Sequence, residues 1–323
     1  VSNRNLVANF STVTYNVNTS SNPISGGNTT GDGTFNSGSS VTVTATPSSG
    51  YQFVNWSESG TAVSTSQSYT FNISANRTLV ANFSLNSYTI STSSLPAGGG
   101  TTSGGGSYNY GESATVTATP STGYRFVNWT AGGTAVSTNA SYTFTVTANR
   151  TLVANFTTLT YTITTSTSPA GVGSASGGGI YNYGASATVT AATATGYRFV
   201  NWTEGGTVVS TASSYTFTVS SNRSLLANYS INTYSVTTSS SPSAGGSTSG
   251  AGIYNHGTQA TVTATPSAGY LFINWTESGS IVSTNVGYSF TVTGARTLVA
   301  NYSLITYTIT TASSPPAGGT TSG

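Results

Sequence analysis

GYRFVNWT at residues 123–130, SYTFTVT at 141–147 and RTLVANF at 150–156 decide the fold of this chain. They are rich in aromatic and β-branched residues, and the second stretch alternates apolar with polar side chains, as half-buried β-strands do. The stretches recur every 73 residues, as the tryptophans show: Trp56, Trp129, Trp202 and Trp275. A function of such a chain belongs to the repeated unit or to the row of units.

The spacing contains no insertion or deletion, so it divides the chain into units. Tyrosines mark the unit starts: Tyr15, Tyr88, Tyr161, Tyr234 and Tyr307. We predict the end of a truncated repeat at 1–14, complete repeats at 15–87, 88–160, 161–233 and 234–306, and the start of a truncated repeat at 307–323. Because both terminal segments begin or end inside a unit, we expect a window from a longer array.

Composition excludes several classes of function. Hydrophobic residues make up 36% of the chain, which is enough for real cores, but charged residues make up only 4%, against roughly 25% in ordinary domains. The formal net charge is +2, and the clustered positive charge that neutralises phosphates is missing. We therefore expect no nucleic-acid partner, and little dependence of folding stability on pH.

Cysteine is absent, so the chain has neither disulfides nor thiolate metal sites. No apolar run reaches membrane-spanning length. The polar surface must consist of Ser, Thr and Asn side chains, which is typical of surface proteins. We predict an extracellular or cell-surface location.

The second unit illustrates the expected strands. We predict five, at 88–94, 113–120, 123–130, 141–147 and 150–156, and at most one short irregular strand in the Gly-rich stretch 95–111. Apolar side chains on both sides of 123–130 indicate a central strand covered on both faces. No segment has helical periodicity. The fold class is therefore all-β, with β-sandwich-like or β-grasp-like units, and we place seven aromatic residues in the cores: Trp56, Trp129, Trp202, Trp275, Phe126, Phe144 and Phe217.

Only four residues link one unit to the next: SLNS, TTLT, SINT and SLIT. None contains Gly or Pro and each contains Leu or Ile, so we predict extended, partly buried junctions rather than flexible tethers. A 73-residue unit has a marginal core, which favours neighbours that support each other. We predict an elongated, semi-rigid rod whose open sheet edges offer a route to self-association with other copies.

The motifs TVTATP, GYRFVNWT and TANRTLVANF resemble the divergent internalin B-type repeat family, in which an opening YT(V/I) strand and a Gly-rich turn precede them. All four complete units carry this combination, so the resemblance covers nearly the whole chain. It implies a small extracellular β-rich repeat, found in tandem in large bacterial and archaeal surface proteins as stalk or adhesive segments. The family offers no catalytic residue. Its better-known relatives have a β-grasp-like unit with a short helix, for which this sequence shows no pattern.

Few side chains are suited to catalysis. The chain has five carboxylates and one histidine, and His256 holds the position of Tyr110 and Tyr183 in other units, which indicates a substituted loop aromatic. Asp32 and Glu112 are isolated. We predict that the chain is not an enzyme.

An arginine begins the last strand of every complete unit: Arg77, Arg150, Arg223 and Arg296. We expect it to stack on an aromatic ring or to pair with a glutamate. Three units carry a glutamate just after the tryptophan strand, at Glu58, Glu204 and Glu277, whereas the second has Ala131. One carboxylate per unit does not hold Ca²⁺, which takes about 6–8 oxygen ligands, so we predict no metal and no cofactor.

Several asparagines lie in Asn-x-Ser/Thr sequons at a fixed position of the unit. Those of the last strand are candidate glycan acceptors: Asn82, Asn155, Asn228 and Asn301. A chain so rich in Asn, Ser and Thr produces such matches by frequency alone, so we expect most of them to be unmodified.

The YNYG loops supply candidate ligand contacts: Tyr108, Tyr110, Tyr181 and Tyr183. Exposed aromatic rings bind sugars, although packing beneath the loop is the commoner use. Two hypotheses follow. The leading one is a structural repeat region of an extracellular surface protein that forms a stalk, fibre or filament segment. The alternative is an adhesive module that binds glycans or a cell surface through these loops.

Overall fold

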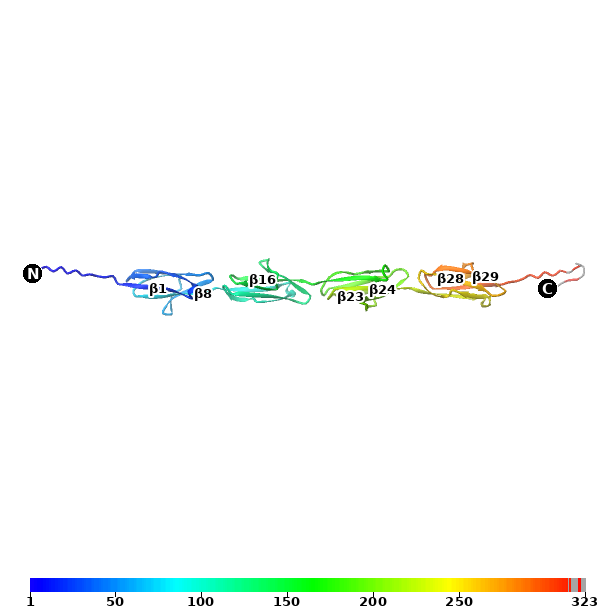
Figure 1. The fold of residues 1–323 in the computed structure, drawn as a ribbon, viewed down its shortest axis with the longest axis horizontal. Coiled ribbons are helices and arrows are strands. Elements are labelled where there is room, and N and C mark those ends of the chain that lie inside the picture. Colours follow the sequence, from blue (N-terminus) through cyan, green and yellow to red (C-terminus); the bar gives the residue numbers. More distant parts are fainter. Residues whose placement is uncertain (313, 315–318, 321–323) are drawn as a thin grey trace. The chain divides into compact units, whose positions relative to one another are not determined.

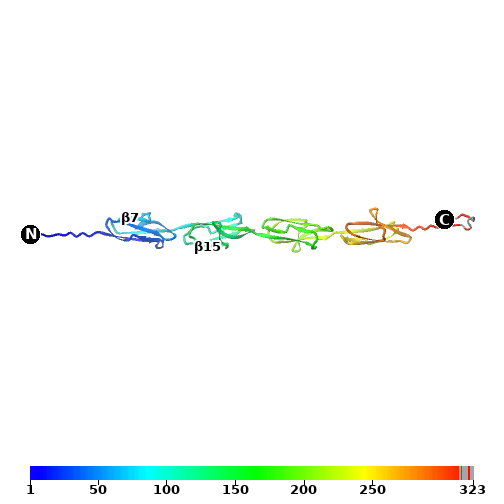
Figure 2. The ribbon, with the colours of Figure 1, turned by 90° about the horizontal axis from the view of Figure 1, so that it is seen from above.

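The computed structural model describes residues 1–312, 314 and 319–320. The chain divides into two compact units, Val1–Leu159 and Thr160–Gly323, each containing two repeats (Figures 1 and 2). Among the described residues, the only helical segments are the 3₁₀ turns η1 (Ile24–Gly26), η2 (Ala97–Gly99) and η3 (Ser243–Gly245). None of the described helices has the length and apolar character that crossing a membrane requires.

Each complete repeat consists of eight β-strands. Those of the first are β1 (Thr14–Asn22), β2 (Gly27–Thr30), β3 (Gly33–Asn36), β4 (Ser40–Pro47), β5 (Tyr51–Glu58), β6 (Thr61–Ser64), β7 (Ser68–Asn72) and β8 (Arg77–Leu85). Those of the second are β9 (Ser87–Leu95), β10 (Gly100–Ser103), β11 (Gly106–Asn109), β12 (Ser113–Pro120), β13 (Tyr124–Ala131), β14 (Thr134–Ser137), β15 (Ser141–Thr145) and β16 (Arg150–Thr158).

The other two repeats have the same order of strands. Those of the third are β17 (Thr160–Ser168), β18 (Ser174–Ser176), β19 (Gly179–Asn182), β20 (Ser186–Ala192), β21 (Tyr197–Glu204), β22 (Thr207–Ser210), β23 (Ser214–Thr218) and β24 (Arg223–Ile231). Those of the fourth are β25 (Thr233–Ser241), β26 (Gly246–Ser249), β27 (Gly252–Asn255), β28 (Gln259–Pro266), β29 (Tyr270–Glu277), β30 (Ser280–Ser283), β31 (Gly287–Thr291) and β32 (Arg296–Leu304).

The strands of a repeat form two sheets. In the first repeat, the five-stranded sheet has the order β3-β1-β8-β5-β6 and the three-stranded sheet the order β2-β4-β7. All neighbours are antiparallel except β1 and β8, the first and last strands, which run parallel. The buried side chains of both sheets meet in one core per repeat. The prediction of all-β tandem repeats is therefore confirmed, and the unit is a β-sandwich.

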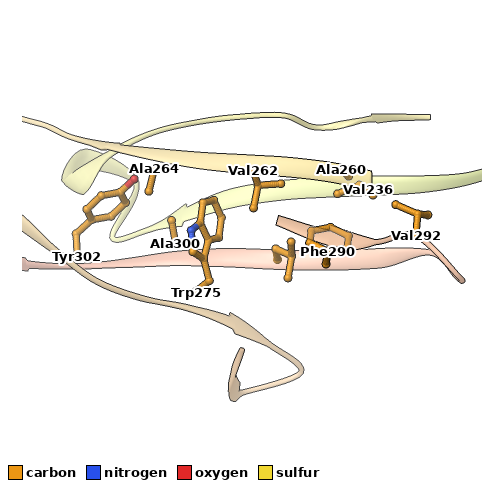
Figure 3. Packing of buried hydrophobic residues seen from close by; sticks show 10 residues of the cluster. Val236, Ala260, Val262, Ala264, Trp275, Phe290, Val292, Ala300 and Tyr302 are labelled. Atoms are coloured by element: carbon orange, nitrogen blue, oxygen red, sulfur yellow. The ribbon is translucent and has the colours of Figure 1, made fainter. Parts of the chain in front are cut away.

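A fully buried tryptophan lies at the centre of every core. Figure 3 shows Trp275 projecting from the five-stranded sheet towards Val262 of the other sheet. Its indole Nε1 donates to the carbonyl oxygen of Val286 at 3.1 Å, which satisfies its one polar group. Trp56, Trp129 and Trp202 make the equivalent bond to Gln67, Ala140 and Ser213. Phe126, Phe144 and Phe217 are half-buried and pack against their cores.

A β-bulge corrects the prediction of a strand covered on both faces. In β13 the register with β16 shifts between Phe126 and Asn128, which makes Val127 the extra residue. The bulge turns Phe126 to the same face as Trp129, and their ring centroids are 6.0 Å apart. Val127 stays 39% exposed. The tryptophan strand therefore has one buried face, and the strand at the centre of the sheet is β16.

Two predictions undercounted the strands. The Gly-rich stretch 95–111 forms two strands, β10 and β11, where at most one is predicted, and β14 lies between the predicted strands 123–130 and 141–147, where none is predicted. β11 and β14 are the two edges of the five-stranded sheet and β10 is an edge of the other sheet. Each of these edge strands has only four residues and pairs with only one neighbouring strand. Such a short strand shows little alternation of apolar and polar residues in the sequence.

Of the described residues in the two terminal segments, only Thr14, the first residue of β1, belongs to a strand. Residues 1–13 lie outside any strand, and Leu6 and Phe10 are 94% and 95% exposed. Residues 307–312 also lie outside any strand. Residues 313, 315–318 and 321–323 of the predicted segment 307–323 lie outside the described residues.

The arginine that begins the last strand stacks on an aromatic ring in every repeat. The guanidinium carbon lies 4.2 Å from the ring centroid of Phe71 for Arg77, and 4.4 Å from that of Phe144 for Arg150. Arg77 Nη2 also lies 2.7 Å from Glu58 Oε2, and Arg223 and Arg296 bind Glu204 and Glu277 in the same way. Arg150 has no such carboxylate among the described residues, because Ala131 replaces it.

The ion pair affects both pKa values. Hydrogen bonds from Arg77 lower the pKa of Glu58, and Arg296 lowers the pKa of Glu277 in the same way. The hydrogen bond to Glu58 raises the pKa of Arg77. Because the folded glutamate has the lower pKa, the pair stabilises the repeat above the unfolded glutamate pKa of about 4.3. This contribution is lost as the pH falls through the lowered folded value.

Replacing Ala131 with glutamate should therefore stabilise the second repeat by about 0.5–1 kcal/mol at pH 7, a modest gain because such pairs are partly solvated. Amide hydrogen exchange in β16 measures the stability of this repeat alone. The neutral variant Ala131→Gln is the control and should show little of the gain. At pH 3 the glutamate variant should lose its advantage; an equal gain for both variants would contradict an ionic role.

Candidate functional site: the junction between repeats

The described residues contain no group of three potential metal ligands and no pocket. The isolated carboxylates serve local structure. Asp32 Oδ1 accepts the backbone N–H of Thr19 at 2.6 Å, and Glu112 Oε2 accepts that of Asn109 at 2.8 Å. The features that recur with the repeat are structural contacts. Among them, the contacts at the junction between repeats form the candidate functional site.

The candidate glycan acceptors pair with a neighbouring strand. Asn82 Nδ2 donates to Asn55 Oδ1 at 2.7 Å and to Ser57 Oγ at 2.9 Å, which joins β8 to the bulged β5. The other three make the same amide pair: Asn155, Asn228 and Asn301 with Asn128, Asn201 and Asn274. Because Nδ2 is the atom that a glycan would modify, glycosylation of the folded repeat would remove one of the two N–H donors that Asn82 uses in these bonds.

The loop tyrosines divide into two groups. Tyr108 and Tyr181 are half-buried, and their hydroxyls donate to the carbonyl oxygens of Gly104 and Gly177 at 2.9 and 2.8 Å. Tyr183 lies beside Tyr161, with ring centroids 6.4 Å apart. Tyr110 lies beside Tyr88 in the same way and also contacts the preceding repeat.

The junction inside the first unit consists of one residue. β8 ends at Leu85 and β9 begins at Ser87, so Asn86 alone separates the strands. Its backbone N–H donates to the carbonyl oxygen of Gly50 in the first repeat at 2.8 Å. Its carbonyl oxygen accepts the N–H of Tyr110 in the second repeat at 2.9 Å. Both backbone groups of the linking residue are thus bonded, one to each repeat.

The ring of Tyr110 packs directly on the backbone of Gly50. A Cβ atom at Gly50 would lie 2.0 Å from Tyr110 Cδ1, so only glycine leaves room for the ring. Gly50 also has a φ of +83°, which favours glycine. The hydroxyls of Tyr110 and Ser49 are 3.1 Å apart, and the rings of Tyr110 and Tyr88 are 6.5 Å apart. We call Gly50, Asn86 and Tyr110 the junction clamp.

The second unit contains an equivalent clamp. Asn232 N–H donates to Gly196 O at 2.8 Å, and its carbonyl oxygen accepts the N–H of His256 at 2.8 Å. His256 replaces tyrosine, packs on Gly196, and lies 6.0 Å from Tyr234 between ring centroids. Its Nδ1 is buried and has no hydrogen-bond partner among the residues that the structure describes. Its position supports the interpretation of a substituted loop aromatic that has a packing role.

Strand topology places the clamp where the chain passes between repeats. The parallel ladder of the first repeat begins where Val17 pairs with Arg77 and ends where Asn22 pairs with Asn82. β1 begins before this ladder and pairs there with β3, while β8 continues beyond it and pairs with β5. The chain therefore enters a repeat at one end of the five-stranded sheet and leaves it at the opposite end.

Comparison with known proteins gives one family. The sequence model of the divergent InlB B-repeat domain matches residues 17–87, 90–160, 163–233 and 236–306. Among solved structures, the TIE protein of Bacillus anthracis is similar at 10% identity and a TM-score of 0.37, over 83% of this chain and 62% of that one. A major pilin of Streptococcus pyogenes is similar at 12% identity and a TM-score of 0.14, over 59% and 66%. The chain thus spans less than two thirds of either protein. No curated protein matches it.

Gly50→Ala should loosen the junction inside the first unit, because the new methyl group displaces the ring of Tyr110. Chymotrypsin, which cuts after Tyr and Leu, should cleave at Leu85 or Tyr110 several times faster than in the unmodified chain. Gly60→Ala is a matched control, because Gly60 has a φ of +80° but nothing within 4 Å of its Cβ position. Both variants should lose about 1 kcal/mol through backbone strain. Equal cleavage in both would show that the clamp does not hold the junction.

Proposed function

We propose that this chain, a member of the divergent InlB B-repeat domain family, has a structural role. It forms a tension-resistant stalk segment of an extracellular surface protein. One observation carries the proposal: the first and last strands of each repeat are parallel neighbours. The family match and the clamped junctions support it.

Parallel end strands determine how a repeat responds to tension. A pull on the chain draws β1 back towards its start and draws β8 forward towards its end. Because the two strands are parallel and adjacent, they are forced to slide past each other. The bonds along the ladder from Val17 to Asn22 must then break together rather than one after another. A repeat held in this way unfolds slowly under force.

The junction clamp passes tension from one repeat to the next without a slack linker. In the first unit, β8 and β9 are separated by Asn86 alone, and in the second unit β24 and β25 are separated by Asn232 alone. Each of these residues bonds both adjoining repeats through its backbone. A stalk that keeps its length under load requires such short and bonded connections.

Composition supports an exposed location. The chain contains no cysteine and few charged groups, so neither redox state nor pH affects its fold strongly. Acid would remove the three Glu–Arg pairs found among the described residues. A stalk at a cell surface meets variable conditions of this kind, and the low charge leaves solubility to Ser, Thr and Asn.

Single-molecule pulling on the whole chain tests the proposal. Stretching from the chain ends should give four similar unfolding events, each releasing up to about 25 nm of chain, as expected for about 73 residues at ~3.4 Å each. The events should occur at similar forces, because the four ladders have the same register. Extension at low force without distinct events would contradict a stalk under tension.

A second attachment geometry is the control, and the absence of native cysteine makes it simple. Cysteines at the exposed positions Ser241 and Ser303 would attach handles to β25 and β32 at the same end of their ladder. Pulling there separates the strands one pair at a time. The fourth repeat should then unfold at a markedly lower force than it does from the chain ends. Equal forces in both geometries would show that the parallel ladder does not resist the load.

A further inference from the structure

The two edges of the five-stranded sheet change together along the chain. On one edge the residues at equivalent positions are Thr34, Ser107, Ile180 and Ile253, and on the opposite edge they are Ala62, Ala135, Val208 and Ile281. The first two repeats thus carry small or polar side chains on both edges. The third and fourth carry large apolar side chains on both.

These four apolar side chains face solvent. Ile180 and Ile253 are 74% and 78% exposed, and Val208 and Ile281 are 51% and 62% exposed. Their strand neighbours Tyr181 and Val209 pack against the core, so Ile180 and Val208 lie on the outer face of the sheet. The cores of these repeats therefore do not account for the large apolar residues at the edges.

The edge strands themselves can accept another strand. β19 and β22 are the edges of the sheet in the third repeat, and β27 and β30 are those of the fourth. Their sequences, GIYN, TVVS, GIYN and SIVS, contain no charged residue and no proline. Natural proteins commonly use such residues to keep edges from pairing, so these edges are protected only by their shortness.

Strand directions make the two edges complementary. β19 is antiparallel to β17, which is parallel to β24. β22 is antiparallel to β21, which is itself antiparallel to β24. β22 therefore runs opposite to β19. When two copies lie side by side and point the same way, β22 of one meets β19 of the other as an antiparallel pair, the more stable kind.

We propose that the third and fourth repeats bind a second copy of this chain edge to edge, with β19 and β27 of one copy against β22 and β30 of the next. Ile180 then packs against Val208, and Ile253 against Ile281, across the contact. Each copy offers this contact in two repeats, and contacts made by both strengthen each other through multivalency. Because different edges meet, the contact leaves a free edge on each side, and further copies add to form a lateral bundle of stalks. The inference rests on the proposed stalk function and names its partner.

Sedimentation velocity of the whole chain, from micromolar to millimolar concentration, tests this inference. The unmodified chain should form species that grow with concentration. Ile180→Ser with Ile253→Ser, and separately Val208→Ala with Ile281→Ala, should each weaken association by roughly tenfold or more. These changes install residues that the first two repeats carry. Ile24→Ser with Val54→Thr removes other exposed apolar side chains and should leave association unchanged.

Mixing the two edge variants distinguishes unlike-edge pairing from pairing of like edges. Each variant keeps one intact edge, so an equimolar mixture should form dimers and stop there. If like edges paired, each variant alone would still associate through its intact edge, and the inference would be wrong. An unmodified chain that stays monomeric throughout would also overturn it. A monomeric chain would not by itself contradict the stalk function, because the pulling experiment on single molecules tests that function without a second copy.

Discussion

The parallel pairing of the first and last strands is the constraint on which the rest of each repeat depends. A repeat that returned its last strand antiparallel to its first would begin and end at the same side. Here β1 and β8 point the same way, so the chain crosses the whole sandwich before the next repeat begins. The ladder also closes the repeat, because it joins residues about sixty positions apart in the sequence, such as Asn22 and Asn82.

The other recurring residues serve this arrangement. The tryptophan fills the space between the sheets and bonds the backbone ahead of β7, β15, β23 or β31. The bulge in the tryptophan strand turns Phe126 and Trp129 to one face, which lets a sheet with a single buried face hold both aromatic rings. The arginine at the start of the closing strand stacks over the aromatic pair of the strand before it, which in the first repeat is Tyr69 and Phe71 of β7. Glycine at the junction gives Tyr110 or His256 a flat backbone surface to pack on.

Much of the fold could be predicted from the sequence because the long strands alternate clearly. Leu152, Ala154 and Phe156 lie in the core of the second repeat as the pattern indicates. The bulge could not be predicted, because strict alternation along the strand places Val127 on the same face as Trp129. The extra residue turns Val127 away from the core and brings Phe126 to the face of Trp129. Short edge strands such as β14 escape prediction because four residues are too few to show a clear alternation of apolar and polar side chains. The packing partner of Tyr110 could not be predicted from the unit alone, because Gly50 belongs to another repeat.

In both units the chain passes between clamped repeats without a flexible linker. Amide hydrogen exchange at Asn86 and Asn232 in the unmodified chain tests it most directly, because both amides donate to the preceding repeat. We expect protection close to that of amides within β8 and β24. Exchange as fast as that of an exposed turn, such as the one at Gly60, would mean that the repeats are independent domains on a tether.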